Sequence, residues 1–86
     1  MKLWLLRPID NTSINDNPWE PWYDKTFGFV IRAENEQEAR ELTDAEAGDE
    51  KHYNGKRTWL EPKYATCVEL TAEGESGIII KDYAAA

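Results

Sequence analysis

A strand pattern runs directly into a helix pattern in residues 27–48, FGFVIRAENEQEARELTDAEAG, and this stretch decides the fold. Apolar side chains alternate with others in its first part, where one face carries Phe27, Phe29, Ile31 and Ala33. A period of two residues is typical of a strand that buries one face. We therefore predict a strand over residues 27–33.

The second part of the stretch has the signals of a capped helix. Asn35 is a favoured N-cap residue, and Glu38, three residues later, completes a box-like pair. Good helix formers follow until a glycine closes the stretch, which predicts a helix over residues 36–47. Its apolar stripe is narrow, chiefly Ala39 and Leu42, so only a thin face can dock and most of the helix is expected in solvent.

Three further segments have strand character. Residues 2–9 are dense in Leu and Trp, residues 66–70 alternate, and residues 78–83 are rich in Ile. A turn over residues 72–77 would join the last two segments as a hairpin. The predicted fold is α+β, a mostly antiparallel four-stranded sheet with one helix on one face, in the order β-β-α-β-β.

Size and composition limit the protein class. A chain of 86 residues has room for a single small domain, residues 1–86, and its 41% hydrophobic content is too high for a disordered chain. A lone cysteine excludes an internal disulfide, and a reducing compartment is the default. No run approaches the roughly 18 apolar residues of a membrane span, so we expect a cytoplasmic protein without membrane contact.

The formal net charge of -7 is concentrated in residues 34–50, which hold eight acids against one base, Arg40. Overall acidity argues against direct nucleic-acid binding. A helix over residues 36–47 would instead carry about one carboxylate per 3.6 Å, close to the spacing of about 3.4 Å along one DNA strand. Such a helix could occupy a basic groove built for nucleic acid, or it could be an ordinary solvated face. The candidate partner-binding acids are Glu36, Glu38, Glu41, Asp44, Glu46, Asp49 and Glu50.

An aromatic segment is the second candidate surface. The loop predicted over residues 10–26 is long for a small domain and holds Trp19, Trp22 and Tyr23 around two prolines. Stiffly held aromatics make good anchors on a partner protein, yet a domain of this size also needs large side chains to cover its sheet. Both roles, partner anchor and core cover, remain open for these three residues.

Catalytic machinery is not apparent. His52 and Cys67 are the only imidazole and the only thiol, and no orienting motif surrounds either of them. A metal site lacks ligands, and no phosphate-binding glycine motif is present. We expect no catalytic residue, no cofactor and no metal, and hence a protein that is not an enzyme.

The segments MKLWLLRPI, DNPWEPWYDK, FGFVIRAE running into EQEARELT, AGDE, and WLEPKYATCVELT resemble a set of small proteins of tailed bacteriophages and prophages. The likeness covers nearly the whole chain, and the tryptophan-proline segment is its most specific part. That group has no settled activity, so the resemblance implies an origin rather than a mechanism.

The combined expectation is a phage-encoded, non-enzymatic inhibitor of a host defence system, of the anti-CRISPR type, acting in the cytoplasm of the host bacterium. Its partner would be a host protein with a basic surface, such as a CRISPR effector or nuclease subunit. The alternative is a structural or accessory phage protein that self-associates through the loop and an exposed strand edge. The oligomeric state is left open.

Overall fold

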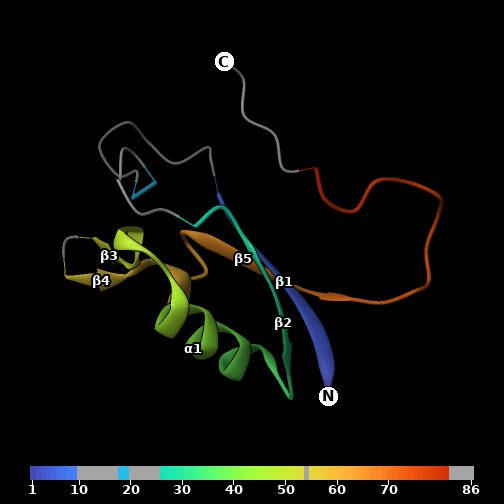
Figure 1. Ribbon diagram of the computed structural model, residues 1–86, viewed down its shortest axis with the longest axis horizontal. Helices are drawn as coiled ribbons and strands as arrows, with labels where there is room; N and C mark the ends of the chain where they lie inside the picture. Colours follow the sequence, from blue (N-terminus) through green and yellow to red (C-terminus); the bar gives the residue numbers. More distant parts are fainter. Residues whose placement is uncertain (10–17, 20–25, 54, 82–86) are drawn as a thin grey trace.

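The computed structural model describes residues 1–9, 18–19, 26–53 and 55–81. The elements follow one another as β1 (Lys2–Pro8), β2 (Phe29–Ala33), α1 (Glu36–Glu46), the 3-10 turn η1 (Asp49–Lys51), β3 (His52–Tyr53), β4 (Lys56–Arg57), the 3-10 turn η2 (Thr58–Leu60) and β5 (Ala65–Leu70) (Figure 1). The protein is thus a small α+β fold whose described part holds one α-helix and antiparallel sheets, which confirms the predicted class.

The main sheet has three strands in the order β2-β1-β5, and β1 pairs antiparallel with both neighbours. Leu5 marks the register, since it lies opposite Val30 on one side and Val68 on the other. The predicted four-stranded sheet is wrong, because residues 78–81 form no strand and Asp82 and Tyr83 fall outside the described residues.

The reason is that strand propensity alone does not place a segment beside an edge. After β5 the chain turns through residues 71–77, where Gly74 takes a φ of 139°, and it leaves the sheet instead of folding back beside β5 (Figure 1). The isoleucines that predicted a strand therefore have no ladder to join.

A second, two-stranded sheet was missed from the sequence. In it β3 pairs with β4, with His52 opposite Arg57 and Tyr53 opposite Lys56. Each strand has only two residues, too few for a period to be seen, but the dipeptide of residues 54–55, Asn-Gly, is a strong hairpin signal. Gly55 has a φ of 77°, the left-handed backbone that favours glycine in such a turn.

Helix α1 begins as predicted. The Asn35 side chain accepts a hydrogen bond from the Glu38 amide at 2.9 Å, while the Glu38 carboxylate accepts one from the Glu34 amide at 2.8 Å. The first bond satisfies an amide that the first helical turn leaves without a helical partner, and the second ties the residue before the N-cap to that turn. The helix ends at Glu46, one residue before the predicted end, because Ala47 has extended backbone angles.

The core lies between one face of the main sheet and the layer formed by α1 and η2. Trp59 on η2 is fully buried, and its ring makes edge contacts with Trp19 at 5.0 Å and with Phe29 at 5.3 Å between centroids. Ala33 on β2 and Ala39 on α1 are also fully buried, and their small side chains suit a close approach of helix and sheet.

Trp19 belongs to this core. It is 3% exposed, and its indole N–H donates to the Tyr64 carbonyl at 3.1 Å. The sequence left two roles open for Trp19, core cover and partner anchor. The structure shows that it covers the core. Its proposed role as a partner anchor is wrong because its ring is buried. Trp22 and Tyr23 lie outside the described residues.

Candidate partner-binding surface

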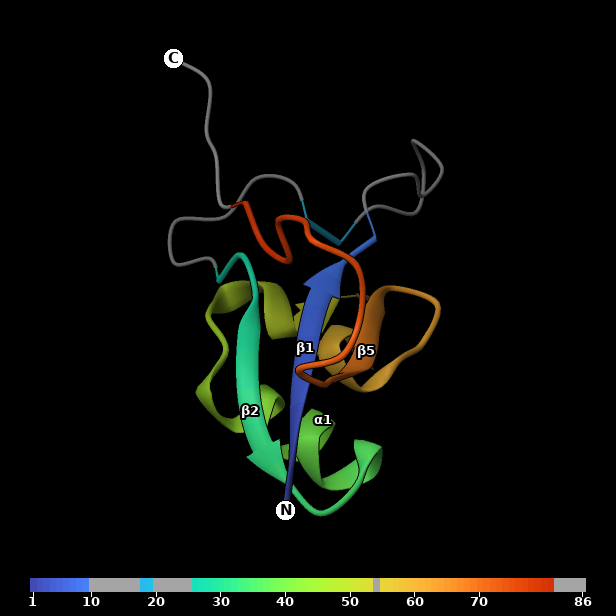
Figure 2. The ribbon, with the colours of Figure 1, turned by 90° about the vertical axis from the view of Figure 1, so that its right-hand side faces the viewer.

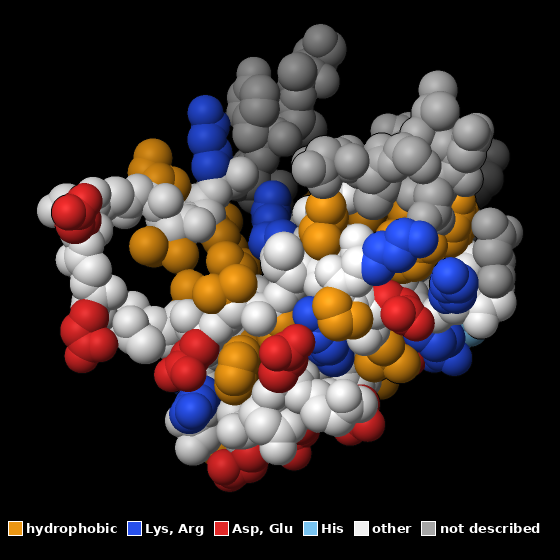
Figure 3. Space-filling model, turned by 180° about the vertical axis from the view of Figure 1, so that it is seen from behind, with side chains coloured by type: hydrophobic (Ala, Val, Ile, Leu, Met, Phe, Trp, Pro, Cys, Tyr) orange, Lys and Arg blue, Asp and Glu red, His pale blue; other side chains and the backbone are white. Residues whose placement is uncertain are grey.

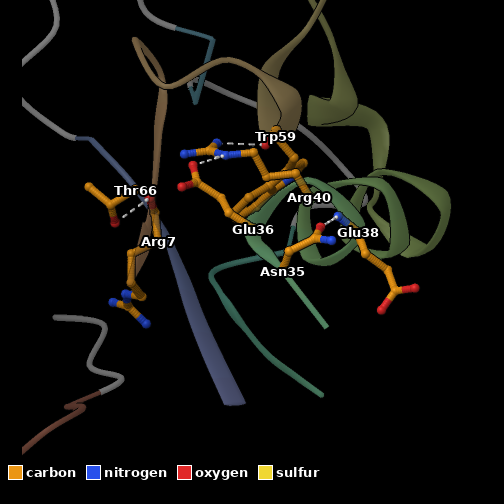
Figure 4. A network of polar contacts seen from close by, with 7 residues as sticks. All are labelled: Arg7, Asn35, Glu36, Glu38, Arg40, Trp59 and Thr66. Atoms are coloured by element: carbon orange, nitrogen blue, oxygen red, sulfur yellow. Dashed lines mark hydrogen bonds and ion pairs between the residues drawn. The ribbon is translucent and has the colours of Figure 1, made fainter. Parts of the chain in front are cut away.

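The solvent-facing side of α1 and of the turn after it carries carboxylates. The buried position of Arg40 leaves these carboxylates without a basic neighbour from the acidic stretch on that side. Arg40 is the only base in the acidic stretch, yet it is 4% exposed. Its Nε donates to the Glu36 carboxylate at 2.8 Å, and its Nη1 donates to the Trp59 carbonyl at 3.0 Å (Figure 4). The guanidinium is therefore turned inward, and the outer side of the helix keeps no cation of its own.

Four of the seven predicted acids stay accessible. Glu41, Glu46 and Asp49 are exposed, and the Glu36 side chain, although paired with Arg40, is 49% exposed. We call Glu36, Glu41, Glu46 and Asp49 the acidic patch. Acidic side chains gather along the lower side of the molecule in the space-filling view, the side on which α1 lies (Figure 3).

Glu50 is not part of any surface, so its predicted partner-binding role is wrong. It is 0% exposed, and its two carboxylate oxygens accept from the Trp59 indole N–H at 3.2 Å and from the Thr26 amide at 2.5 Å. The Thr58 hydroxyl donates to its carbonyl at 2.6 Å. A buried carboxylate is kept where donors surround it, and here they tie η1 to η2.

Asp44 is also engaged within the fold. Its side chain is 13% exposed and faces Arg57 on β4, whose Nε and Nη2 donate to the two carboxylate oxygens at 3.0 and 2.5 Å. The fork pairing neutralises an acid that the negative end of the helix dipole would otherwise disfavour. Asp44 and the capping residue Glu38 therefore have structural roles, and the predicted continuous row of helix charges becomes a looser patch.

The Asp44–Arg57 pair predicts a measurable coupling. A double-mutant cycle with Asp44→Ala and Arg57→Ala should give about 0.5–1 kcal/mol of interaction free energy in urea unfolding, because the pair is bidentate but Arg57 is 44% exposed. The coupling should shrink in 1 M NaCl.

The matched control is Lys2–Glu69, a longer surface pair at 3.5 Å with both side chains well exposed. Its cycle should give a coupling near zero. Equal coupling for the two pairs would contradict the assigned role of Asp44 in holding β4 against the helix.

The single thiol and the single imidazole of the chain lie in different sheets. Cys67 on β5 is half-buried against the core, and burial raises the pKa of its thiol above the usual value, which keeps it protonated at neutral pH. His52 is exposed on β3, in the other sheet. Within the described residues no three His, Cys, Asp or Glu side chains gather as a metal site.

Comparison with known proteins adds no further assignment. No family model, curated protein or solved structure matches this chain. Across the described ranges, no helix combines the length and apolar character that crossing a bilayer requires.

A second accessible surface was missed from the sequence. The sheet face opposite α1 is apolar, with Leu3, Val30 and Val68 exposed. The available signal was that strands 2–9 and 27–33 carry large aliphatic residues on both faces, a pattern more usual for sheets covered on both sides.

Proposed function

We propose that this protein is a non-enzymatic binding protein whose acidic patch docks on a basic surface of another macromolecule. The inward turn of Arg40 carries this proposal, because it places the one cation of the acidic stretch beneath the helix and leaves the carboxylates outside. Complementary charge speeds encounter with a partner and selects it.

The partner class follows from the charge of the patch. Surfaces rich in Lys and Arg that attract carboxylates are typical of nucleic-acid-binding proteins. With Asp44 paired and Glu50 buried, the patch fits electrostatic competition for such a surface better than close imitation of a phosphate row. The likeness to small phage proteins makes the concrete version an inhibitor of a host CRISPR effector or nuclease subunit.

The test is capture of partners from bacterial lysate by the tagged protein and by the variant Glu41→Lys/Glu46→Lys. Both side chains are exposed on α1, so the fold should tolerate the change. We expect the native protein to retain a nucleic-acid-binding protein that salt or added nucleic acid releases. The variant should bind that protein at least about tenfold more weakly, equivalent to about 1.4 kcal/mol.

The matched control is Glu61→Lys/Glu69→Lys, which changes the net charge equally at exposed residues outside the patch. It should retain the partner, apart from the general loss that both variants share. Equal capture by all three proteins, or capture that added nucleic acid does not disturb, would refute docking through the acidic patch.

A further inference from the structure

The outer face of the main sheet, opposite α1, is an open apolar surface. Leu3 is 39% exposed, Val30 50% and Val68 55%. The register places Leu5 directly between Val30 and Val68, and Leu70 beside Leu3, so these side chains form one continuous cluster. Figure 2 looks onto this face, with α1 behind the strands and the orange-to-red segment that follows β5 passing in front of them.

Residues 71–81, which we call the arm, carry a second uncovered apolar group. Ile78 is 81% exposed, Ile79 68% and Ile80 41%. The arm leaves β5 and arches away from the body, and the space-filling view shows an opening between the two (Figures 1 and 3). Arm residues 71–77 and Ile79 line a cavity of about 420 Å³ there. Three adjacent isoleucines in solvent are costly unless something covers them.

The two surfaces also differ in charge in a complementary way. Arg7 and Arg32 lie on the outer face, and the Arg7 side chain passes over Gly28, where an added Cβ would lie 2.9 Å from Arg7 Cδ. The arm carries Glu73 and Glu75, both exposed. Among the described residues, no ion pair joins these arginines or these glutamates to any partner.

We propose that a second copy of this chain covers these surfaces, in a two-fold dimer in which each copy's arm lies over the outer sheet face of the other. Ile78–Ile80 would pack on the Leu and Val cluster, and the glutamates of the arm would face Arg7 and Arg32. The chain carries both halves of this interface, yet its own arm passes over the outer face without covering it, since the isoleucines and the valines all stay exposed (Figure 2). Reciprocal exchange in a two-fold dimer covers all four surfaces at once.

This interface is separate from the acidic patch, which lies on the helix side of the sheet. It also differs from association through a strand edge, because it uses the face of the sheet. Failure of one proposal therefore leaves the other standing, and their variants do not overlap.

Sedimentation velocity of the full chain over a range of concentrations provides the first test. We expect a dimer, and we expect both Ile78→Asp/Ile79→Asp on the arm and Val30→Lys/Val68→Lys on the face to sediment as monomers with unchanged circular dichroism. Leu42→Lys is the control, because Leu42 is similarly exposed, at 45%, but lies on α1. It should remain a dimer.

A charge-swap experiment tests the exchange itself. Chains with Glu73→Arg/Glu75→Arg and chains with Arg7→Glu/Arg32→Glu should each dimerise at least tenfold more weakly than the native chain, because like charges meet in both homodimers. Mixing them should restore a dimer, since every arm then meets a face of opposite charge. A monomer at all concentrations, or a dimer unaffected by the face and arm variants, would overturn the proposal. An arm that folds onto its own sheet would give the monomer result.

Discussion

Trp59→Ala is expected to remove a large fraction of the free energy of unfolding, more than any other substitution in the core. The side chain is fully buried and packs on two other rings, and its indole N–H donates to Glu50. Removing a buried Trp costs about 3–5 kcal/mol from lost burial and the cavity left behind. A domain of this size has a total stability of roughly 4–13 kcal/mol, at about 0.05–0.15 kcal/mol per residue.

Thermal and urea unfolding followed by circular dichroism would measure the effect. Leu42→Ala is the control, because that side chain is 45% exposed, and it should change the free energy of unfolding by less than about 0.5 kcal/mol. A Trp59→Ala protein that melts within a few degrees of the native chain would show that the core is not organised around this ring.

Glu50→Ala should have the second largest effect, a loss of about 2–5 kcal/mol. Its carboxylate receives the Trp59 indole N–H and the Thr26 amide, and each donor left without an acceptor in a buried setting costs about 1–3 kcal/mol. Glu50→Gln should lose less, since one oxygen still accepts while the new amide N–H faces a donor.

The control for this series is Glu46→Ala, four residues away and exposed on the same acidic stretch. Its free energy of unfolding should stay within about 0.5 kcal/mol of the native value. Urea denaturation of all three variants gives the comparison. If Glu50→Ala is as stable as Glu46→Ala, the buried carboxylate is not a structural link between η1 and η2.

Which acids belong to the candidate surface could be predicted only in part from the sequence. Glu46 and Glu50 are the same residue type in the same acidic run, yet one is exposed and the other is fully buried. Nothing within a few residues of Glu50 distinguishes it. Its role depends on Trp59 and Thr26, which lie 9 and 24 residues away in the chain.

The direction of the Arg40 side chain could not be predicted from the sequence either. A long Arg side chain can reach solvent or fold beneath its helix, and helical spacing does not decide between them. Arg40 turns inward because the Trp59 carbonyl of η2 lies there as an acceptor. The exposure of the apolar sheet face could not be predicted either. Alternation shows which residues share a face, but not whether another layer of the protein covers that face.

The sequence by itself determined those features that depend on near neighbours along the chain: a strand ending at Ala33, predicted over residues 27–33 and observed over Phe29–Ala33, the Asn35–Glu38 cap, the start of α1 and the α+β class. Tertiary structure decided the number of strands in the sheet, the inward turn of Arg40, the burial of Glu50 and Trp19, and the exposure of Ile78–Ile80. The physical reason is the distance along the chain over which each effect acts. Periodicity and capping act over about one helical turn or two strand residues, whereas burial and pairing require partners that the chain brings together only when it folds.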